Sequence, residues 1–437
     1  MLHLDEARHQ ALEALRHLLA GTPKSVKAVL IDDLFGHIRV VLWPGKRNGS
    51  KLLDQTRKVL QEAAGTYWSG EIWDASQAGE SDRLVYDHAW EEAAGSEVLP
   101  RKLRLLLRHR NRGAWLSPLA EPPWSIPSRP SLKRPPIVAF YSFKGGVGRS
   151  TALAAFAIQQ ARQGERIVVV DADLDAPGVG SLLAADPEGT TANWGVLDYL
   201  LERPFYDQVD LGDYYHACRR EVVSGPGEIL VFPTGRLDDD YLGKLARIDL
   251  EPSHSNEGPH PLHRLLQEIR EQLSPSWILV DVRAGLANPA GFILAGIAHL
   301  YVLFGTFSEQ SWHGLRLVIR HLGAKRVQVG KPQADCLLVQ AMVPRVTDPP
   351  GVATTAFAER SLDEFTEHYY AAEGGEDLWT TVDDVESSDA PHVPVPLLYN
   401  DQLAYFRTID EVADLLAKSE DYRALAIRIL SRFGGGA

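Results

Sequence analysis

The sequence predicts an α/β protein in which a doubly wound, mostly parallel sheet follows a small α+β domain. After residue 136, short apolar and β-branched runs alternate with amphipathic helical stretches, as a parallel sheet buried on both faces requires. Before residue 117, helical and strand-like stretches occur in mixed order. Seven prolines in twenty residues separate the two patterns. The sequence therefore predicts two domains, residues 1–116 and 137–437, joined by a linker over 117–136.

The elements of the first domain follow from hydrophobic periodicity. The spacing predicts a helix, two strands around a turn, a second helix, an apolar strand and two further helices. The first five cover residues 4–19, 26–32, 37–43, 51–63 and 67–73. Trp43, Trp68 and Trp73 lie on the apparent strands, where packing in a core is the default interpretation and a partner surface is the alternative.

The last helical stretch of the first domain, RKLRLLLRHRNRGAW over residues 101–115, is strongly basic. Its leucines recur at helical spacing, which predicts an amphipathic helix with a solvated basic face; a nucleic-acid or phospholipid surface is the alternative. The chain carries a net charge of −13, but its first 140 residues hold 20 Lys and Arg against 16 Asp and Glu. The remainder holds 25 against 42, so we do not expect the acidic second domain to bind nucleic acid.

Seven apolar runs of the second domain are expected to form its sheet. They cover residues 137–143, 166–171, 228–233, 276–281, 300–305, 336–341 and 393–398. Ligands of such sheets bind outside the carboxyl ends of the strands, so the polar residues directly after these runs are the candidates for chemistry.

Composition excludes several classes of protein. Hydrophobic residues make up 45% and charged residues 24%, which excludes a disordered, collagen-like or coiled-coil chain. Cys218 and Cys336 stand 118 positions apart, so no disulfide framework or cysteine-based metal site is expected within one chain. The N-terminus does not resemble a signal peptide and no stretch is long and apolar enough to span a membrane. We expect a cytoplasmic protein.

Residues 144–151, KGGVGRST, are expected to cradle phosphate groups between a strand and a helix. Three glycines let the backbone curl so that N–H groups point inward, and the helix N-terminus adds positive potential. The hydroxyl of Ser150 is placed to bind Mg²⁺, and Thr151 can contact a phosphate oxygen. The residues expected to bind nucleotide here are Gly145, Gly146, Val147, Gly148, Arg149, Ser150 and Thr151.

Carboxylates gather at the ends of two further strands. Asp171, Asp173 and Asp175 occupy alternate positions in VVVDADLDAPG, and Asp281 follows the apolar run SWILV. Neighbouring carboxylates repel one another, so a hydrated Mg²⁺ or an oriented water gives a reason for their accumulation. The alternative is a polar turn in which the aspartates cap backbone N–H groups.

KGGVGRST resembles the deviant P-loop, KGGxGK[ST]T, of the ParA/MinD class of ATPases, and more narrowly its KGGVGR variant. The resemblance covers about 300 residues after the linker and implies a P-loop fold of the SIMIBI type that binds ATP and Mg²⁺. It also implies a homodimer held by ATP, in which Lys144 reaches the nucleotide of the opposite subunit. Two positions depart from the class: Arg149 stands where lysine is usual, and Phe143 where the strict Walker motif has glycine.

The same resemblance implies roles for the acids. Asp173 would orient the attacking water, Asp171 would support the metal site, and Asp281 would hold Mg²⁺ together with Ser150. Arg283 would either sense the γ-phosphate or pair with one of these acids.

Later segments carry weaker implications. Gln340 and Pro394 fall where members of the class contact adenine. Residues 306–309 have capping-box spacing before a helix, which we interpret first as structure and second as a switch segment.

The function that follows is a slow, Mg²⁺-dependent ATPase whose ATP-bound dimer recruits or regulates a partner protein. The alternative is a catalytically silent nucleotide-binding adaptor. Partner specificity is expected in the first domain, because the phosphate machinery lies after the linker. Members of the KGGVGR group look like components of bacterial regulatory or defence systems, which implies such a setting here.

The C-terminal stretch DYRALAIRILSRF forms an apolar stripe flanked by arginines, somewhat like the membrane-targeting tail of MinD. Docking of this helix on the sheet is the favoured interpretation, and peripheral membrane contact is the alternative. The stripe consists of Tyr422, Leu425, Ala426, Ile429 and Phe433.

Overall fold

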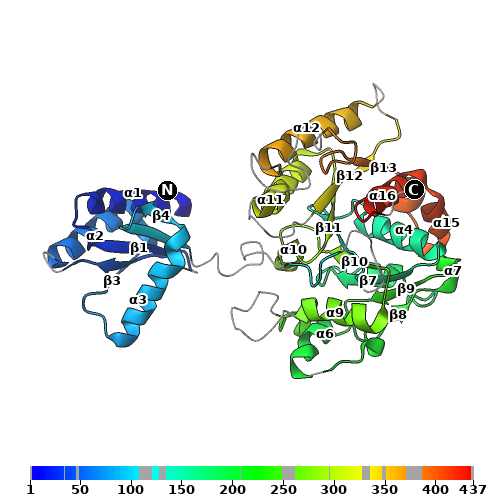
Figure 1. Cartoon of the computed structure of the whole chain (residues 1–437), viewed down its shortest axis with the longest axis horizontal. Helices are drawn as coiled ribbons and strands as arrows, with labels where there is room; N and C mark the ends of the chain where they lie inside the picture. The colour runs from blue at the N-terminus through cyan, green and yellow to red at the C-terminus, as the bar shows by residue number, and fades with distance from the viewer. Residues whose placement is uncertain are drawn as a thin grey trace. The chain divides into compact units, whose positions relative to one another are not determined.

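The chain forms two compact units, Met1–Leu116 and Ser117–Ala437 (Figure 1). Each unit has its own hydrophobic core. The structure is a computed structural model. It describes residues 2–33, 35–45, 49–107, 121–126, 134–206, 208–248, 261–294, 296–326, 335–346, 351–370 and 386–434.

The first unit is a five-stranded sheet with helices on both faces. Its elements are α1 (Leu4–Ala20), β1 (Lys27–Asp32), β2 (Ile38–Trp43), α2 (Gly49–Ala64), β3 (Trp68–Asp74), α3 (Glu80–Glu92), β4 (Glu97–Leu99) and β5 (Leu103–Leu107). The strand order is β3-β2-β1-β5-β4. Leu30 and Val40 pack with α1 and α2, whereas Val29 and Val41 pack with α3. This alternation is the two-residue period of a strand, and it buries the sheet on both sides.

Residues 103–107 form a strand, so the helix predicted there is wrong. β5 pairs in parallel with the central strand β1, and this pairing buries Leu103 and Leu106 on opposite faces of the sheet. Leucine at helical spacing expresses only a weak local preference, and the tertiary environment of a sheet outweighs it.

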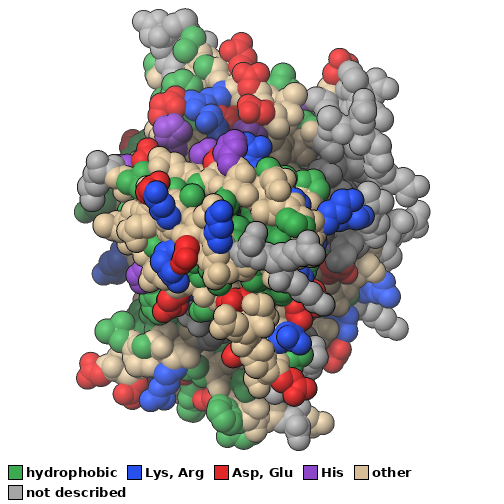
Figure 2. All heavy atoms as spheres, turned by 90° about the vertical axis from the view of Figure 1, so that its left-hand side faces the viewer, with side chains coloured by type: hydrophobic (Ala, Val, Ile, Leu, Met, Phe, Trp, Pro, Cys, Tyr) green, Lys and Arg blue, Asp and Glu red, His purple; other side chains and the backbone are tan. Residues whose placement is uncertain are grey.

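The basic side chains beside β5 have partners within the first unit. Lys102 Nζ donates to the carbonyl oxygen of Leu19 (3.0 Å), near the end of α1, where the helix dipole favours a cation. Arg104 Nη2 donates to Glu97 (2.9 Å), and its guanidinium lies 4.0 Å from the centroid of the Trp90 ring. On the face shown in Figure 2, Lys and Arg are scattered among acidic and apolar side chains. Arg108, Arg110 and Arg112 lie outside the described residues.

Packing inside the unit accounts for the three strand tryptophans. Trp68 is buried in the core beneath α1 and α2. Trp43 meets Trp90 edge to face, with 5.8 Å between ring centroids. Trp73 stacks on Tyr86 at 5.9 Å. The default interpretation of these residues, core packing, therefore describes their positions.

The second unit is built on an eight-stranded sheet of order β13-β12-β11-β6-β10-β7-β9-β8. All neighbouring strands are parallel except β8, which pairs antiparallel with β9 at one edge. The strands are β6 (Ile137–Ser142), β7 (Arg166–Ala172), β8 (His216–Ala217), β9 (Glu228–Phe232), β10 (Trp277–Val282), β11 (Leu300–Gly305), β12 (Asp335–Val343) and β13 (Val395–Leu398). The predicted α/β class with a mostly parallel sheet is confirmed, and only the short β8 was not expected.

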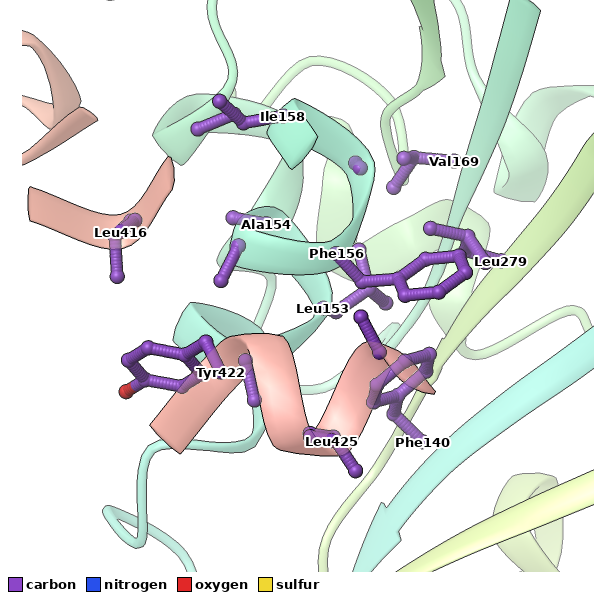
Figure 3. Close-up of a cluster of buried hydrophobic side chains, with 14 of the residues drawn as sticks. Phe140, Leu153, Ala154, Phe156, Ile158, Val169, Leu279, Leu416, Tyr422 and Leu425 are labelled. Atoms are coloured by element: carbon purple, nitrogen blue, oxygen red, sulfur yellow. The ribbon is translucent and has the colours of Figure 1, made fainter. Parts of the chain in front are cut away.

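Helices cover both faces of this sheet. The longer ones are α4 (Arg149–Arg162), α6 (Val196–Glu202), α9 (Pro261–Leu273), α10 (Asn288–Leu294), α11 (Glu309–Arg326), α12 (Val352–His368) and α16 (Glu420–Ser431). The shorter ones are α5 (Val179–Leu182), α7 (Arg220–Val223), α8 (Tyr241–Leu245), α14 (Asp401–Ala404) and α15 (Ala413–Lys418). On one face, α4, α15 and α16 form a core with Phe140, Val169 and Leu279 (Figure 3). On the other, Gly305 of β11 lies against Leu315 of α11 and Phe357 of α12.

Residues 121–126 of the proline-rich stretch belong to the second unit and pack against its other elements. The Trp124 indole donates to the carbonyl oxygen of Pro135 (2.9 Å), and the Arg270 guanidinium lies 4.8 Å from the ring centroid. The carbonyl oxygen of Trp124 lies 2.7 Å from His299 Nε2. Residues 121–126 are therefore held by specific contacts rather than by chain stiffness alone.

The C-terminal helix α16 docks on the sheet through the apolar stripe that the sequence identifies. All five stripe residues belong to the core cluster that contains α4. Arg428 forms an ion pair with Asp389 (2.5 Å), so a flanking arginine also has a partner within the unit. In the part of the chain that the structure describes, no helix has both the length and the apolar character needed to cross a bilayer.

Candidate nucleotide-binding site

The loop of residues 143–148 curls between β6 and α4 because two of its glycines adopt left-handed backbone conformations. Gly146 has φ 73° and Gly148 has φ 83°, a region that other residues enter only with strain. A Cβ at either position would meet no described atom within 4 Å, so the backbone angle, not crowding, requires glycine. Val147 is buried in the core cluster and anchors the loop.

A cavity of about 580 Å³ opens beside this loop. One side of it consists of Ser142, residues 145–151, Asp173, Ala176, Arg283 and Ala284. The other side is largely apolar and consists of Met342, Leu397, Leu398, Tyr399, Asn400, Leu403, Ala404 and Tyr422. The cavity lies at the carboxyl ends of the strands, where the fold class places ligands.

Arg149, the first residue of α4, bridges two of the predicted acids. Its Nε donates to Asp281 Oδ1 (2.6 Å) and its Nη2 donates to Asp173 Oδ2 (3.0 Å). Ser150 Oγ donates to the other oxygen of Asp281 (2.6 Å). The structure thus brings together Arg149, Ser150, Asp173 and Asp281, which the sequence placed in one site.

Burial and charge act in opposite directions on this cluster. Burial raises the pKa of Asp281, while the guanidinium of Arg149 and the hydroxyl of Ser150 work against that rise. Burial disfavours the charge of Arg149, but the carboxylates of Asp281 and Asp173 outweigh it and raise the pKa of the guanidinium. Arg149 is therefore a permanent cation held among carboxylates.

The carboxylate of Asp171 accepts hydrogen bonds from the backbone that follows it. Its Oδ1 accepts from the N–H of Asp173 (3.2 Å), and its Oδ2 accepts from those of Gly178 and Gly180 (both 3.1 Å). Burial, together with the charge of Asp281 beside it on β10, raises its pKa to about 7. Asp171 does not line the cavity. Its contacts are those of an aspartate that caps backbone N–H groups, which was the alternative interpretation, rather than those of a direct metal ligand.

Arg283 pairs with acids, as one of the two interpretations of this residue anticipated. Its Nη1 lies 3.1 Å from Asp175 and 3.5 Å from Asp173. Lys144 differs from both arginines: it is exposed, and among the described residues none pairs with its ammonium group.

Gln340 and Pro394, expected at the adenine, do not line the cavity. Gln340 is buried and donates from Nε2 to the carbonyl oxygen of Ala353 (3.1 Å), toward α12. Pro394 precedes β13 and thus lies at the opposite end of that strand from the ligand edge. The rule that ligands bind after the strands would have selected residues 397–400 instead.

Met342 is a site residue that the sequence does not reveal. It has φ 58°, and the pairing of β12 with β13 shifts register between Gln340 and Val343. A positive φ at a residue with a side chain is strained and is often found at functional sites. No sequence pattern marks this bulge.

Phe143 and Gly314 explain how the loop is held at its start. A Cβ at Gly314 of α11 would lie 2.0 Å from Phe143 Cγ, so the ring packs directly on the helix backbone. Phe143 thus has a steric role at the position where the Walker motif has glycine. The capping contact of α11 also differs from the expected box: the backbone N–H of Ser311 donates to Ser308 Oγ (3.3 Å), and the backbone N–H of Thr306 donates to Ser311 Oγ (2.9 Å).

These residues fit a magnesium nucleotide. Ser150 lines the cavity, and its hydroxyl contacts the carboxylate of Asp281, which is buried behind it and does not line the cavity itself. A hydroxyl and a carboxylate are oxygen ligands of the kind that Mg²⁺ prefers. The curled loop and the start of α4 present backbone N–H groups to anions. The cavity volume lies within the usual range for small-molecule sites.

Comparison with known proteins finds a family that is similar to this part of the chain. The family described as the CobQ/CobB/MinD/ParA nucleotide binding domain matches residues 138–188, which contain the loop, α4, Asp171 and Asp173. No curated protein sequence matches the chain.

Several solved structures are similar in fold. A ParA family ATPase from Chlorobium tepidum TLS is 15% identical, with 67% of this chain and 97% of that chain covered and a TM-score of 0.41. A cobyrinic acid a,c-diamide synthase from Mycobacterium smegmatis, solved with an ATP analogue and magnesium, is 17% identical, with 69% and 97% covered and a TM-score of 0.42. The cell division ATPase MinD of Pyrococcus furiosus is 17% identical, with 66% and 99% covered and a TM-score of 0.36.

Proposed function

Residues 138–188 match the CobQ/CobB/MinD/ParA nucleotide-binding domain family, and from this premise we propose that the protein is an ATPase that works as a nucleotide-controlled switch. One observation carries the proposal: the glycine loop, Ser150 and Asp173 line a single cavity, and the buried carboxylate of Asp281 contacts Ser150 of that lining. Backbone N–H groups of residues 145–151 bind and orient the phosphates of ATP.

Ser150 and Asp281 are the residues that hold Mg²⁺, and the metal supplies charge neutralisation for the phosphate oxygens when it is bound. Asp173 lines the cavity and orients the attacking water. Arg283 sits beside Asp173 and Asp175 and keeps these carboxylates in place. Hydrolysis is slow, because Arg149 replaces the compact ammonium group that the family uses.

The exposed Lys144 supports a dimer held by ATP. Its side chain has no ion-pair partner among the described residues, so it is available to the phosphates of a nucleotide bound to a second copy. A partner protein is bound through the first unit, whose core is independent of the nucleotide site. The second unit does not bind nucleic acid, because its net charge is strongly negative.

A second candidate function is a nucleotide-binding adaptor without turnover. The observation that favours it is the pairing of Arg149 with both Asp281 and Asp173, which occupies the acids that hydrolysis needs. In that case ATP would still bind and drive association, but it would not be consumed.

The two functions are separated by phosphate release at saturating ATP and Mg²⁺. We expect the wild-type protein to release phosphate and Asp173→Ala to lower the rate by about 100-fold or more, because a positioned base contributes at least that much. Asp175→Ala is the matched control, since it removes a neighbouring carboxylate that is more exposed. A wild-type rate equal to that of Lys144→Ala would favour the adaptor. If Asp173→Ala hydrolyses ATP normally, the role of Asp173 is wrong.

A further inference from the structure

Arg149 connects two strands by using the fork of its guanidinium. Nε donates a hydrogen bond to Asp281 at the end of β10, and Nη2 donates one to Asp173 directly after β7. Only about a tenth of the Arg149 side chain is exposed, and the two carboxylates are almost fully buried. Two buried charge-assisted hydrogen bonds to different acids make this a specific arrangement rather than a surface ion pair.

The arrangement uses the oxygens that a divalent cation would need. Oδ1 of Asp281 accepts a hydrogen bond from Arg149, and Oδ2 of the same carboxylate accepts one from Ser150. A Mg²⁺ ion at Asp281 would lie next to the guanidinium, and repulsion between cations is strong where water is excluded. The metal and Arg149 therefore compete for the same carboxylate.

The substitution of arginine for lysine is what allows this competition. A lysine ammonium is a single compact charge, whereas the planar guanidinium presents separate donors to two acids at once. Arg149 is also the first residue of α4 and lines the cavity, so phosphate groups bound at the loop would lie within its surroundings. They would offer it a bidentate partner in place of the aspartates.

We propose that Arg149 makes metal binding conditional on nucleotide: its guanidinium excludes divalent cations from Asp281 until phosphate groups draw it away from the two carboxylates. The inference rests on the proposed function for the identity of the nucleotide. The empty protein then has little affinity for metal, and nucleotide and metal bind with positive coupling.

The test is a titration of the nucleotide-free, full-length protein with Mn²⁺, in which free Mn²⁺ is measured by electron paramagnetic resonance. We expect weak binding to the wild type and an affinity about 5- to 150-fold higher for Arg149→Gln, the usual range of coupling between two sites. Arg283→Gln is the control, because Arg283 pairs with Asp173 and Asp175 but not with Asp281. It should give no comparable gain.

Two further variants protect the test. Arg149→Lys serves where loss of the charge in Arg149→Gln destabilises the fold, because it keeps a cation at this position. Since a lysine cannot bridge both acids, its Mn²⁺ affinity should lie between those of the wild type and Arg149→Gln. The double variant R149Q/D281N should lose the gain. Equal Mn²⁺ affinity in wild type and Arg149→Gln, or an equal gain in Arg283→Gln, would overturn the proposal. Failure of the wild-type protein to bind ATP, with the Mn²⁺ gain of Arg149→Gln intact, would instead refute the proposed function alone.

Discussion

Phe143 and Gly314 show how one contact between distant residues positions the phosphate loop. The loop backbone is determined locally by its glycines, but its place above the sheet depends on the Phe143 ring resting against α11. The contact leaves no room for a methyl group, because the atoms a Cβ would meet include Cγ, which cannot swing away as the tip of a flexible side chain could.

We therefore expect Gly314→Ala to destabilise the second unit by about 1–3 kcal/mol, as overpacking of a core does, and to weaken ATP binding. Urea unfolding and calorimetric titration measure the two effects. Gly243→Ala is the control: this glycine lies inside α8 with no described atom within 4 Å of its Cβ position. Trimming the ring in F143A/G314A should recover part of the lost stability. An unchanged unfolding midpoint in Gly314→Ala would show that the ring moves aside without cost.

At the scale of elements, His299 connects the segment of residues 121–126 to the sheet. Its Nδ1 accepts from the N–H of Ile137 at the start of β6 (3.0 Å), so its Nε2 carries the proton and donates to the carbonyl oxygen of Trp124. Burial lowers the pKa of His299 to about 4. A proton on Nδ1 would face the N–H of Ile137, so the docked segment requires the neutral ring.

This depressed pKa gives a pH dependence with a definite sign. The unfolded chain takes up a proton near pH 6.5 and the folded chain only near pH 4, so stability is present above pH 6.5 and lost as the pH falls toward 4. Between pH 7 and pH 5 the free energy of unfolding should fall by about 2 kcal/mol more in the wild type than in His299→Gln. Urea unfolding at both pH values measures it. The exposed His313→Gln should keep the wild-type slope, and a His299→Gln slope equal to the wild type would contradict the assignment.

At the scale of the whole molecule, each of the two units is stabilised by its own core. The first unit buries its sheet under α1 and α2 on one face and α3 on the other. The second unit contains every residue of the candidate site and the core that supports it. Units with separate cores are able to fold separately.

We expect residues 1–116 and 117–437, produced as separate fragments, to unfold cooperatively with the midpoints they have in the full chain. The larger fragment should bind ATP as the full chain does. Circular dichroism and calorimetric titration test these expectations. Loss of ATP binding in the fragment 117–437, with its fold retained, would mean that the first unit contributes to the nucleotide site.

Local sequence was a good guide wherever one short segment determines its own conformation. The apolar runs of the second unit became strands, and the glycines of KGGVGRST marked the loop, because side-chain period and backbone freedom act over a few residues. Prediction was wrong for β5, since its leucines fit a helix equally well and only pairing with β1 decided the matter. It also missed Met342, whose bulge depends on the register between β12 and β13.

The sequence by itself determined the order of the elements, the phosphate loop and the set of acids and hydroxyls beside it. The tertiary structure decided which of these residues meet: Arg149 with Asp281 and Asp173, Asp171 with its own backbone, and the apolar wall of the cavity with the loop. The physical reason is that a residue's identity limits what it can bind, whereas its partner depends on which strand ends the folded sheet places side by side.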